Sequence, residues 1–236
     1  GHHGAGGGGY GGEGGDGKSH PGGSSYGDYS APDKLGSAGG RRESDAGHGG
    51  GAVKLTANSG TVTVNGTITA NGGFGDYGGS NEINGGGAGG SIWITADTLA
   101  GGGNITANGG DTYDNNEDGG GGGGGRIALY YNTDDLTLNT LSAVGGYGCD
   151  TSQYGGAGTI YKKAATADYG DLIIRGKTDP SYPTGNGRGD MANTPLDNAL
   201  RVDNFTLDDY ARVDLNDSLE VKNDADIGTT SITTRS

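Results

Sequence analysis

The chain has 236 residues, of which 57 are glycine, and its formal net charge at pH 7 is -14. Leu, Ile, Val and Phe together account for only 33 residues, a share typical of disordered chains, but the net charge is too small for the chain's length to favour disorder. No apolar run is long enough for a transmembrane helix, and the single cysteine excludes a disulfide framework. The negative charge also argues against nucleic acid as a partner.

Residues 1–50 are rich in glycine, and Leu35 is their only residue of the Leu, Ile, Val and Phe set. Ordering so many glycines costs more backbone entropy than ordering other residues, so neighbouring structure has to hold them. We expect extended, polyproline-II-like strands that lie side by side and are covered by tyrosines. This segment is predicted to pack on or between the repeating β-coils that residues 51–167 are expected to form.

Residues 51–167 contain a repeat of about 36 residues. The sequence GTITANGG at 66–73 returns as GNITANGG at 103–110, and a looser copy follows, so that Ile68, Ile105 and Leu141 are equivalent. A fixed period of this length indicates a repeat architecture in which each unit buries its apolar face against the next.

Within each repeat the apolar residues alternate, which is typical of a strand with one buried face. Such strands begin at Val53, Ile92, Ile127 and Ile160, and middle strands are expected at 62–64 and 136–138. Stacked repeats would place equivalent residues over one another, although Lys162 stands where earlier repeats have Leu or Ile. The predicted fold is all-β, a right-handed parallel β-helix (solenoid) with long glycine-rich loops; an antiparallel sandwich is the competing arrangement.

Residues 168–236 have a different sequence pattern, in which short apolar stretches are separated by pairs of Asp and Asn residues. Strands are expected at 172–174, 200–207, 211–215, 219–221 and 227–232. They form either further coils of the same solenoid or a small separate sheet.

Several of these sequences resemble a known class of module. SIWITA at 91–96, RIALYY at 126–131 and AGTIY at 157–161 are similar to the glycine-rich parallel β-helix modules of large secreted and cell-surface, adhesin-like microbial proteins. The resemblance covers about residues 1–165. It implies an extracellular location at the cell surface and a structural or adhesive role, and it supplies no catalytic residues.

A candidate calcium site lies between the second and third repeats. Asp114, Asn116 and Asp118, followed by Gly119, match the first half of a calcium loop. The twelfth position of that loop is glycine, so Asp111 or backbone carbonyls would have to complete the coordination. The alternative is a solvated acidic turn.

Two aromatic residues, Trp93 and Tyr130, alternate along their strands with the apolar residues that point into the core. They are therefore expected to face outward. There they would stack either on sugar rings or on a glycine-rich loop. Four sequons are compatible with glycosylation, or are simply turn residues; they begin at Asn65, Asn104, Asn204 and Asn216.

Enzymatic activity is not expected. His48 between two glycines, and Asp134 next to Asp135, look like fragments of a polygalacturonase signature, but they occur in the wrong order. The sequence therefore predicts a non-catalytic extracellular structural protein, a repeat module or subunit of a cell-surface filament, matrix or adhesin. Its expected partners are further copies of itself and surface glycans. The alternatives are a carbohydrate-binding module and a β-helix polysaccharide lyase or hydrolase.

Overall fold

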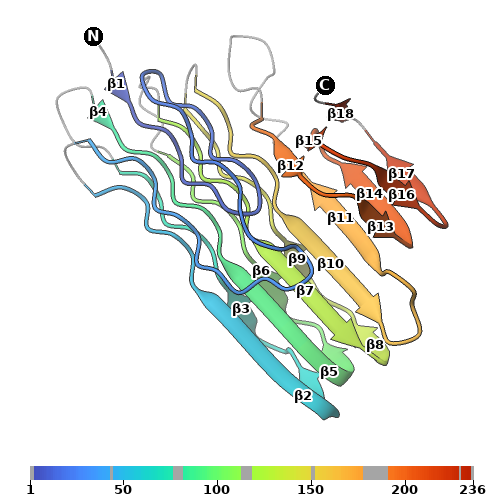
Figure 1. Ribbon diagram of the computed structural model, residues 1–236. Helices are drawn as coiled ribbons and strands as arrows, with labels where there is room; N and C mark the ends of the chain where they lie inside the picture. The colour runs from blue at the N-terminus through green and yellow to red at the C-terminus, as the bar shows by residue number, and fades with distance from the viewer. Residues whose placement is uncertain are drawn as a thin grey trace.

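A computed structural model describes residues 3–42, 45–76, 82–112, 119–149, 152–177, 191–228 and 230–234 (Figure 1). The described residues form strands and no helix, and nearly all strand pairs are parallel, which confirms the all-β class. No helix in this part of the chain is long and apolar enough to span a membrane. The strands are β1 (His3–Gly4), β2 (Ala52–Thr63), β3 (Thr67–Thr69), β4 (Glu82–Ile83), β5 (Ser91–Gly101), β6 (Asn104–Thr106), β7 (Arg126–Tyr131), β8 (Thr133–Leu136), β9 (Thr140–Ser142), β10 (Thr159–Ala164), β11 (Asp171–Arg175), β12 (Thr194–Leu196), β13 (Leu200–Val202), β14 (Asn204–Asp208), β15 (Arg212–Leu215), β16 (Leu219–Val221), β17 (Ala225–Ile227) and β18 (Ser231–Thr234).

The repeat produces two parallel sheets in the N-terminal part. Strands β2, β5, β7 and β10 lie side by side in one sheet, and β3, β6 and β9 form another. In the second sheet Ile68 pairs with Ile105, and Ile105 pairs with Leu141. The first sheet pairs Val53 with Ile92, Ile92 with Ile127, and Ile127 with Ile160. Residues at equivalent repeat positions therefore lie next to one another in register, as the repeat predicts.

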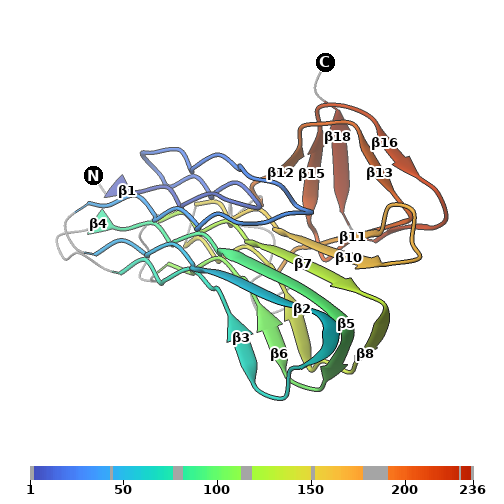
Figure 2. The same cartoon turned by 60° about the horizontal axis from the view of Figure 1, so that its bottom comes forward.

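Side chains from both sheets meet in one apolar core, and Figure 2 shows the sheets enclosing it. Ile92, Ile94, Ile105 and Ile127 are each at most 1% exposed. Complete burial of such a side chain stabilises the folded state by roughly 1.5–3 kcal/mol. These in-register rows of apolar side chains therefore supply most of the apolar stabilisation of the coils.

The middle strand of the third repeat differs from the prediction. Strand β8 spans Thr133–Leu136 instead of 136–138, and Asp134 pairs in register with Leu99. The Asp134 carboxylate lies 2.6 Å from Lys162 Nζ, so two charged residues at otherwise apolar repeat positions neutralise each other. This pair explains why Lys162 is tolerated in β10.

The glycine-rich stretches run as extended segments beside the strands, and we call them rods. The rods are 4–9, 11–17, 19–24, 36–42, 47–51, 70–75, 83–90, 107–112, 119–125, 143–149 and 153–158. Figure 2 shows them as a layer that continues from the strands, with the N-terminal rods on its upper surface. Hydrogen bonds between rods, rather than within them, hold the layer together.

The central rod 83–90 has a period of three residues. Gly85 and Ala88 donate to rod 36–42, Gly86 and Gly89 to rod 119–125, and Gly87 and Gly90 to rod 70–75. Its carbonyls accept from rods 4–9, 47–51 and 107–112. A period of three without internal hydrogen bonds is that of polyproline II, and three donor neighbours alternating with three acceptor neighbours make a hexagonal array.

Glycine is required where rods approach this closely. A Cβ atom at Gly122 would lie 2.0 Å from the carbonyl oxygen of Gly87 in the adjacent rod. Real Cβ atoms do not approach backbone oxygen to this distance, so a side chain would force two rods apart and break their hydrogen bonds.

Gly122→Ala should therefore lower the free energy of unfolding by about 1–3 kcal/mol, as other overpacking substitutions do. Gly51→Ala is the matched control, because a Cβ there meets nothing within 4 Å. The control should be neutral or slightly stabilising. Equal effects of the two variants in urea denaturation would contradict the close-approach argument.

The C-terminal unit has shorter coils. Strand β11 is antiparallel to β10 and continues the first sheet, and β14 and β17 follow it in parallel. Strands β12, β15 and β18 form a second sheet, and β13 and β16 a third, with Leu200 pairing in register with Leu219. Three sheets enclose a separate apolar core that includes Leu172, Phe205 and Leu207. Strand β11 thus joins this unit to the first sheet, and the strand direction reverses at β10–β11.

Two predicted strands in this unit are each divided by a corner. The expected strand 200–207 is β13 and β14, which belong to different sheets, and the expected strand 227–232 is β17 and β18. Asp203 occupies the first corner, where its carboxylate accepts from the backbone N–H of Tyr169 (3.0 Å) and of Gly170 (2.8 Å). These donors lower the Asp203 pKa below its ordinary value.

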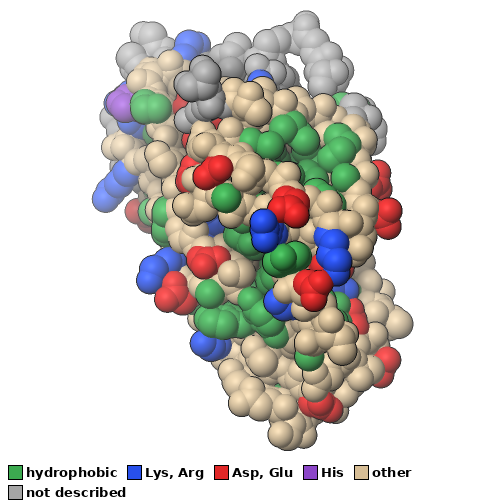
Figure 3. All heavy atoms as spheres, turned by 45° about the vertical axis from the view of Figure 1, so that its right-hand side comes forward, with side chains coloured by type: hydrophobic (Ala, Val, Ile, Leu, Met, Phe, Trp, Pro, Cys, Tyr) green, Lys and Arg blue, Asp and Glu red, His purple; other side chains and the backbone are tan. Residues whose placement is uncertain are grey.

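The side of the molecule that carries the C-terminal unit shows hydrophobic patches between acidic and basic side chains (Figure 3).

Candidate functional site

Residues 26–35 of the N-terminal segment cross the outer face of the first sheet, and three carbonyls attach them there. Tyr26 O accepts from Arg126 Nε (3.1 Å), Ser30 O from Tyr130 Oη (2.6 Å), and Lys34 O from Ser91 Oγ (2.6 Å). Each donor stands on β5 or β7. The glycine-rich segment is therefore bound by its backbone to side chains that face away from the core.

Arg126 is the charged centre of this attachment. It is 4% exposed, its Nη1 also donates to Thr159 Oγ1 (3.3 Å), and its guanidinium lies 5.6 Å from the centre of the Tyr10 ring. Burial lowers the pKa of Arg126, and the nearby Tyr10 and Asp28 oppose that shift. Arginine nevertheless stays protonated in proteins, so its donors remain available at every accessible pH.

Tyr10, between rods 4–9 and 11–17, packs against the same attachment site. Its side chain is fully buried, its hydroxyl is hydrogen-bonded to Ser91 Oγ (2.6 Å), and its ring lies 4.9 Å from that of Tyr26. Burial raises the pKa of Tyr10 above its ordinary value. A tyrosine that stays neutral serves as a buried hydrogen-bonding group.

The two residues proposed for sugar binding have neighbours of their own. The rings of Trp93 and Tyr130 are 6.3 Å apart, and Lys54 Nζ lies 3.5 Å from the centre of the Trp93 ring. The Tyr130 hydroxyl donates to the Ser30 carbonyl, and the Tyr130 ring meets that of Tyr161 edge-on with 5.9 Å between the ring centres. Ser30, the hydrogen-bond partner of Tyr130, belongs to the segment 26–35 that crosses this face.

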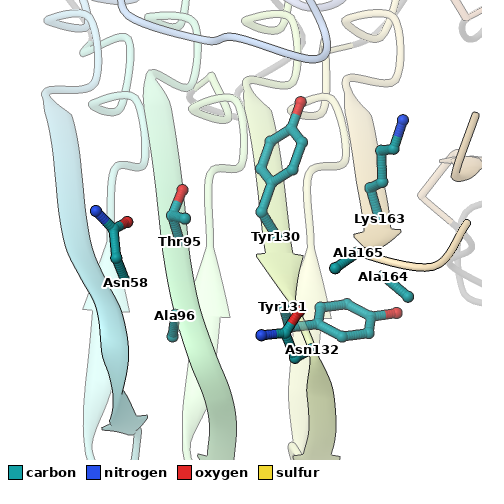
Figure 4. Close-up of a pocket in the computed structure, with 9 residues that line it drawn as sticks. All are labelled: Asn58, Thr95, Ala96, Tyr130, Tyr131, Asn132, Lys163, Ala164 and Ala165. Atoms are coloured by element: carbon teal, nitrogen blue, oxygen red, sulfur yellow. The ribbon is translucent and has the colours of Figure 1, made fainter.

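A small pocket opens next to Tyr130 on the same outer face, with a volume of about 200 Å³ (Figure 4). Thr95, Tyr130 and Lys163 stand in one row because β5, β7 and β10 pair in register. Asn58 and Asn132 add amides, and Asn132 Nδ2 donates to Asp97 Oδ1 (2.6 Å). Lys163 Nζ donates to Asp168 O (2.9 Å). The pocket therefore combines an aromatic ring with the Thr95 hydroxyl and two amides, which can donate to and accept from a small polar ligand.

Of the pair Trp93 and Tyr130 expected to face outward, Tyr130 lines this pocket and Trp93 does not. The sequence did not point to the polar residues Asn58, Thr95, Asn132 and Lys163. The repeat could have predicted two of them, because Thr95 and Lys163 occupy the position of Tyr130 in adjacent repeats and therefore lie beside it. Asn58 could not be placed this way, because the register of β2 shifts between Ala57 and Thr61.

The proposed calcium ligands are only partly within the described residues. Asp114, Asn116 and Asp118 lie outside them. The Asp111 carboxylate accepts from Lys177 Nζ (2.6 Å) and from the Tyr147 N–H (2.8 Å), so it already has a cationic partner. Within the described ranges, no group of three or more His, Cys, Asp or Glu side chains could hold a metal ion.

The four sequon asparagines differ in their surroundings. Asn65 is exposed between β2 and β3. Asn104 Nδ2 lies 3.4 Å from Thr67 Oγ1, and the amides of Asn204 and Asn216 donate to Asp171 and Asp197 respectively. Asn65 is thus the sequon with the freest side chain.

The residues that resembled fragments of a hydrolase signature lie on different kinds of element. His48 is exposed on rod 47–51, whereas Asp134 lies on β8 and is paired with Lys162. Comparison of the chain with protein-family models, with curated proteins and with solved structures gives no match.

Arg126→Met should loosen the attachment of residues 26–35, because it removes the donors to Tyr26 and Thr159. Hydrogen bonds from a buried charged group contribute about 1.5–3 kcal/mol each, so we expect the free energy of unfolding to fall by roughly 2–4 kcal/mol. Amide hydrogen exchange within 26–35 should accelerate. Arg201→Met removes an exposed arginine, 61% exposed and paired with Glu220, and should leave both measurements unchanged.

Proposed function

We propose that the chain is a non-catalytic structural module of an extracellular, cell-surface filament, matrix or adhesin. In this proposal the N-terminal coils are those of a right-handed parallel β-helix, and modules associate by stacking coil on coil. The free edge of β2 is the observation that carries the proposal.

Strand β2 has twelve residues and, among the described strands, pairs only with β5. Its Leu55 is 37% exposed, although the equivalent residue of the next coil, Ile94, is 1% exposed. The difference arises because β5 has a neighbour on each side whereas β2 has one. A long, unpaired strand edge with apolar inward residues favours the addition of a further strand.

A further coil on β2 would bury Leu55 and Val53 and would pair the open backbone groups. Solenoid proteins that do not associate usually have a polar terminal repeat, whereas β2 has the same inward apolar residues as the coils next to it.

The outer face of β3, β6 and β9 is uncharged and presents Thr67, Thr69 and Thr106. This surface is suited to hydrogen bonding with neutral partners.

Leu55→Lys tests this proposal, because an inward-pointing charge at a sheet edge blocks strand addition. We expect the wild-type protein to form polymers visible by electron microscopy and light scattering, and the variant to remain monomeric. Thr56→Lys places the same charge on the outer face of β2 and should still polymerise. A wild-type protein that stays monomeric at high concentration would contradict the proposal.

A second candidate, carbohydrate binding, is favoured by the pocket beside Tyr130. Asn58→Ala removes a pocket amide that has no hydrogen-bond partner among the described residues, so the fold should not change. The loss of one hydrogen bond to a sugar, about 1 kcal/mol, should weaken binding roughly fivefold. A glycan array with Asn65→Ala as the control measures this; the absence of any wild-type binding would exclude the candidate.

A further inference from the structure

A groove opens on the outer surface of the rod layer, between rods 4–9, 19–24 and 36–42. Its volume is about 460 Å³, and it is lined mainly by glycine together with Ala38, His20 and two arginines. Its floor is rod 4–9. The place of this groove in the hexagonal array indicates what it binds.

Rod 4–9 has hydrogen-bonded neighbours in five directions. Ala5 and Gly8 donate to rod 83–90, and Gly7 donates to rod 11–17; the carbonyls of Ala5 and Gly8 accept from rod 119–125, those of Gly4 and Gly7 from rod 19–24, and that of Gly6 from rod 36–42. Around rod 83–90 the same analysis gives six neighbours, with donor and acceptor directions alternating. One donor direction of rod 4–9 is therefore unoccupied.

The unoccupied direction belongs to Gly6 and Gly9. Their N–H groups are three residues apart, as are those of the other donor pairs, and neither has a partner among the described residues. Alternation of donors and acceptors places this direction between rods 19–24 and 36–42. That position coincides with the groove, which Gly6 lines and beside whose end Gly9 follows in the chain, so the groove is a vacant rod position of the array.

The wall of the groove also has unused polar groups. The carbonyls of Ala38 and Gly39 accept no hydrogen bond within the described part of the chain. Nε of Arg42, which lines the groove, is buried and has no partner there either. A buried polar atom such as Arg42 Nε is normally satisfied, and leaving it unpaired costs about 1–3 kcal/mol.

We propose that the groove binds a glycine-rich, extended segment of a second polypeptide. Such a segment repeats every three residues, so successive carbonyls on one side would meet the N–H groups of Gly6 and Gly9. Its own N–H groups would reach the carbonyls of Ala38 and Gly39. Backbone pairing of this kind is also the basis of strand addition to a sheet edge.

The array also determines the sequence that fits. A Cβ at Gly8 would lie 2.2 Å from Ser37 O, and one at Gly6 would lie 2.1 Å from Pro21 O, so rods in this region touch backbone to backbone. The bound segment needs glycine wherever it faces the floor and walls, and tolerates side chains on its outer side. This recognition is separate from coil stacking at β2 and goes beyond the proposed function.

A peptide with the sequence of residues 82–91, EINGGGAGGS, is a suitable probe because the chain itself uses this sequence as a rod. In a titration followed by NMR of the labelled full chain, the largest amide shifts should occur at Gly6 and Gly9. A peptide of equal length with alanine in place of every glycine should not bind. Equal binding of both peptides, or no shift with millimolar glycine peptide, would overturn the proposal.

Ala38→Trp provides the second test, because Ala38 is exposed and lines the groove, so the larger side chain can fill it without disturbing the core. Peptide affinity should fall at least about tenfold, a loss of about 1.4 kcal/mol, with unchanged thermal unfolding. Unchanged affinity would contradict binding in the groove. Leu55→Lys should still bind the peptide, so a failure of coil stacking and a failure of this site can be told apart.

Discussion

The structure depends on hydrogen bonds between rods whose backbones touch. Each interior rod directs its N–H groups to three neighbours in turn and receives bonds from three others, so that the backbone itself satisfies its polar groups without a helix or a sheet. This arrangement is possible only if side chains are absent at the contacts, as at Gly122. The glycine content that suggests disorder is thus what allows the rods to associate.

The rods and the strands support each other. Every coil of the N-terminal unit passes from a rod into a strand, as rod 119–125 does into β7, so the in-register ladder of Ile92, Ile127 and Ile160 fixes the lateral position of the rods. In return, Tyr10, which links rods 4–9 and 11–17, binds Ser91 of the sheet, and the segment 26–35 crosses the sheet's outer face through Arg126.

The sequence alone was sufficient for the local and periodic features. The repeat of 36 or 37 residues predicted the pairing of Ile68, Ile105 and Leu141, because identical sequences stack in register. It did not predict the corner at Asp203, although the apolar alternation changes phase there, with Val202 and Phe205 three residues apart. It also did not predict the reversal at β10–β11. The attachment of Tyr26 to Arg126 joins residues 100 positions apart through a backbone carbonyl, which leaves no pattern in the sequence.

The rod layer also affects how stability changes with temperature. Unfolding a rod exposes mostly peptide groups, whose hydration lowers the heat capacity, whereas exposure of an apolar core raises it. A protein that keeps much of its ordered backbone in rods should therefore have a smaller heat-capacity increment of unfolding than its length suggests. Its stability curve would be flat, and cooling would weaken it less than it weakens a protein held together mainly by apolar burial.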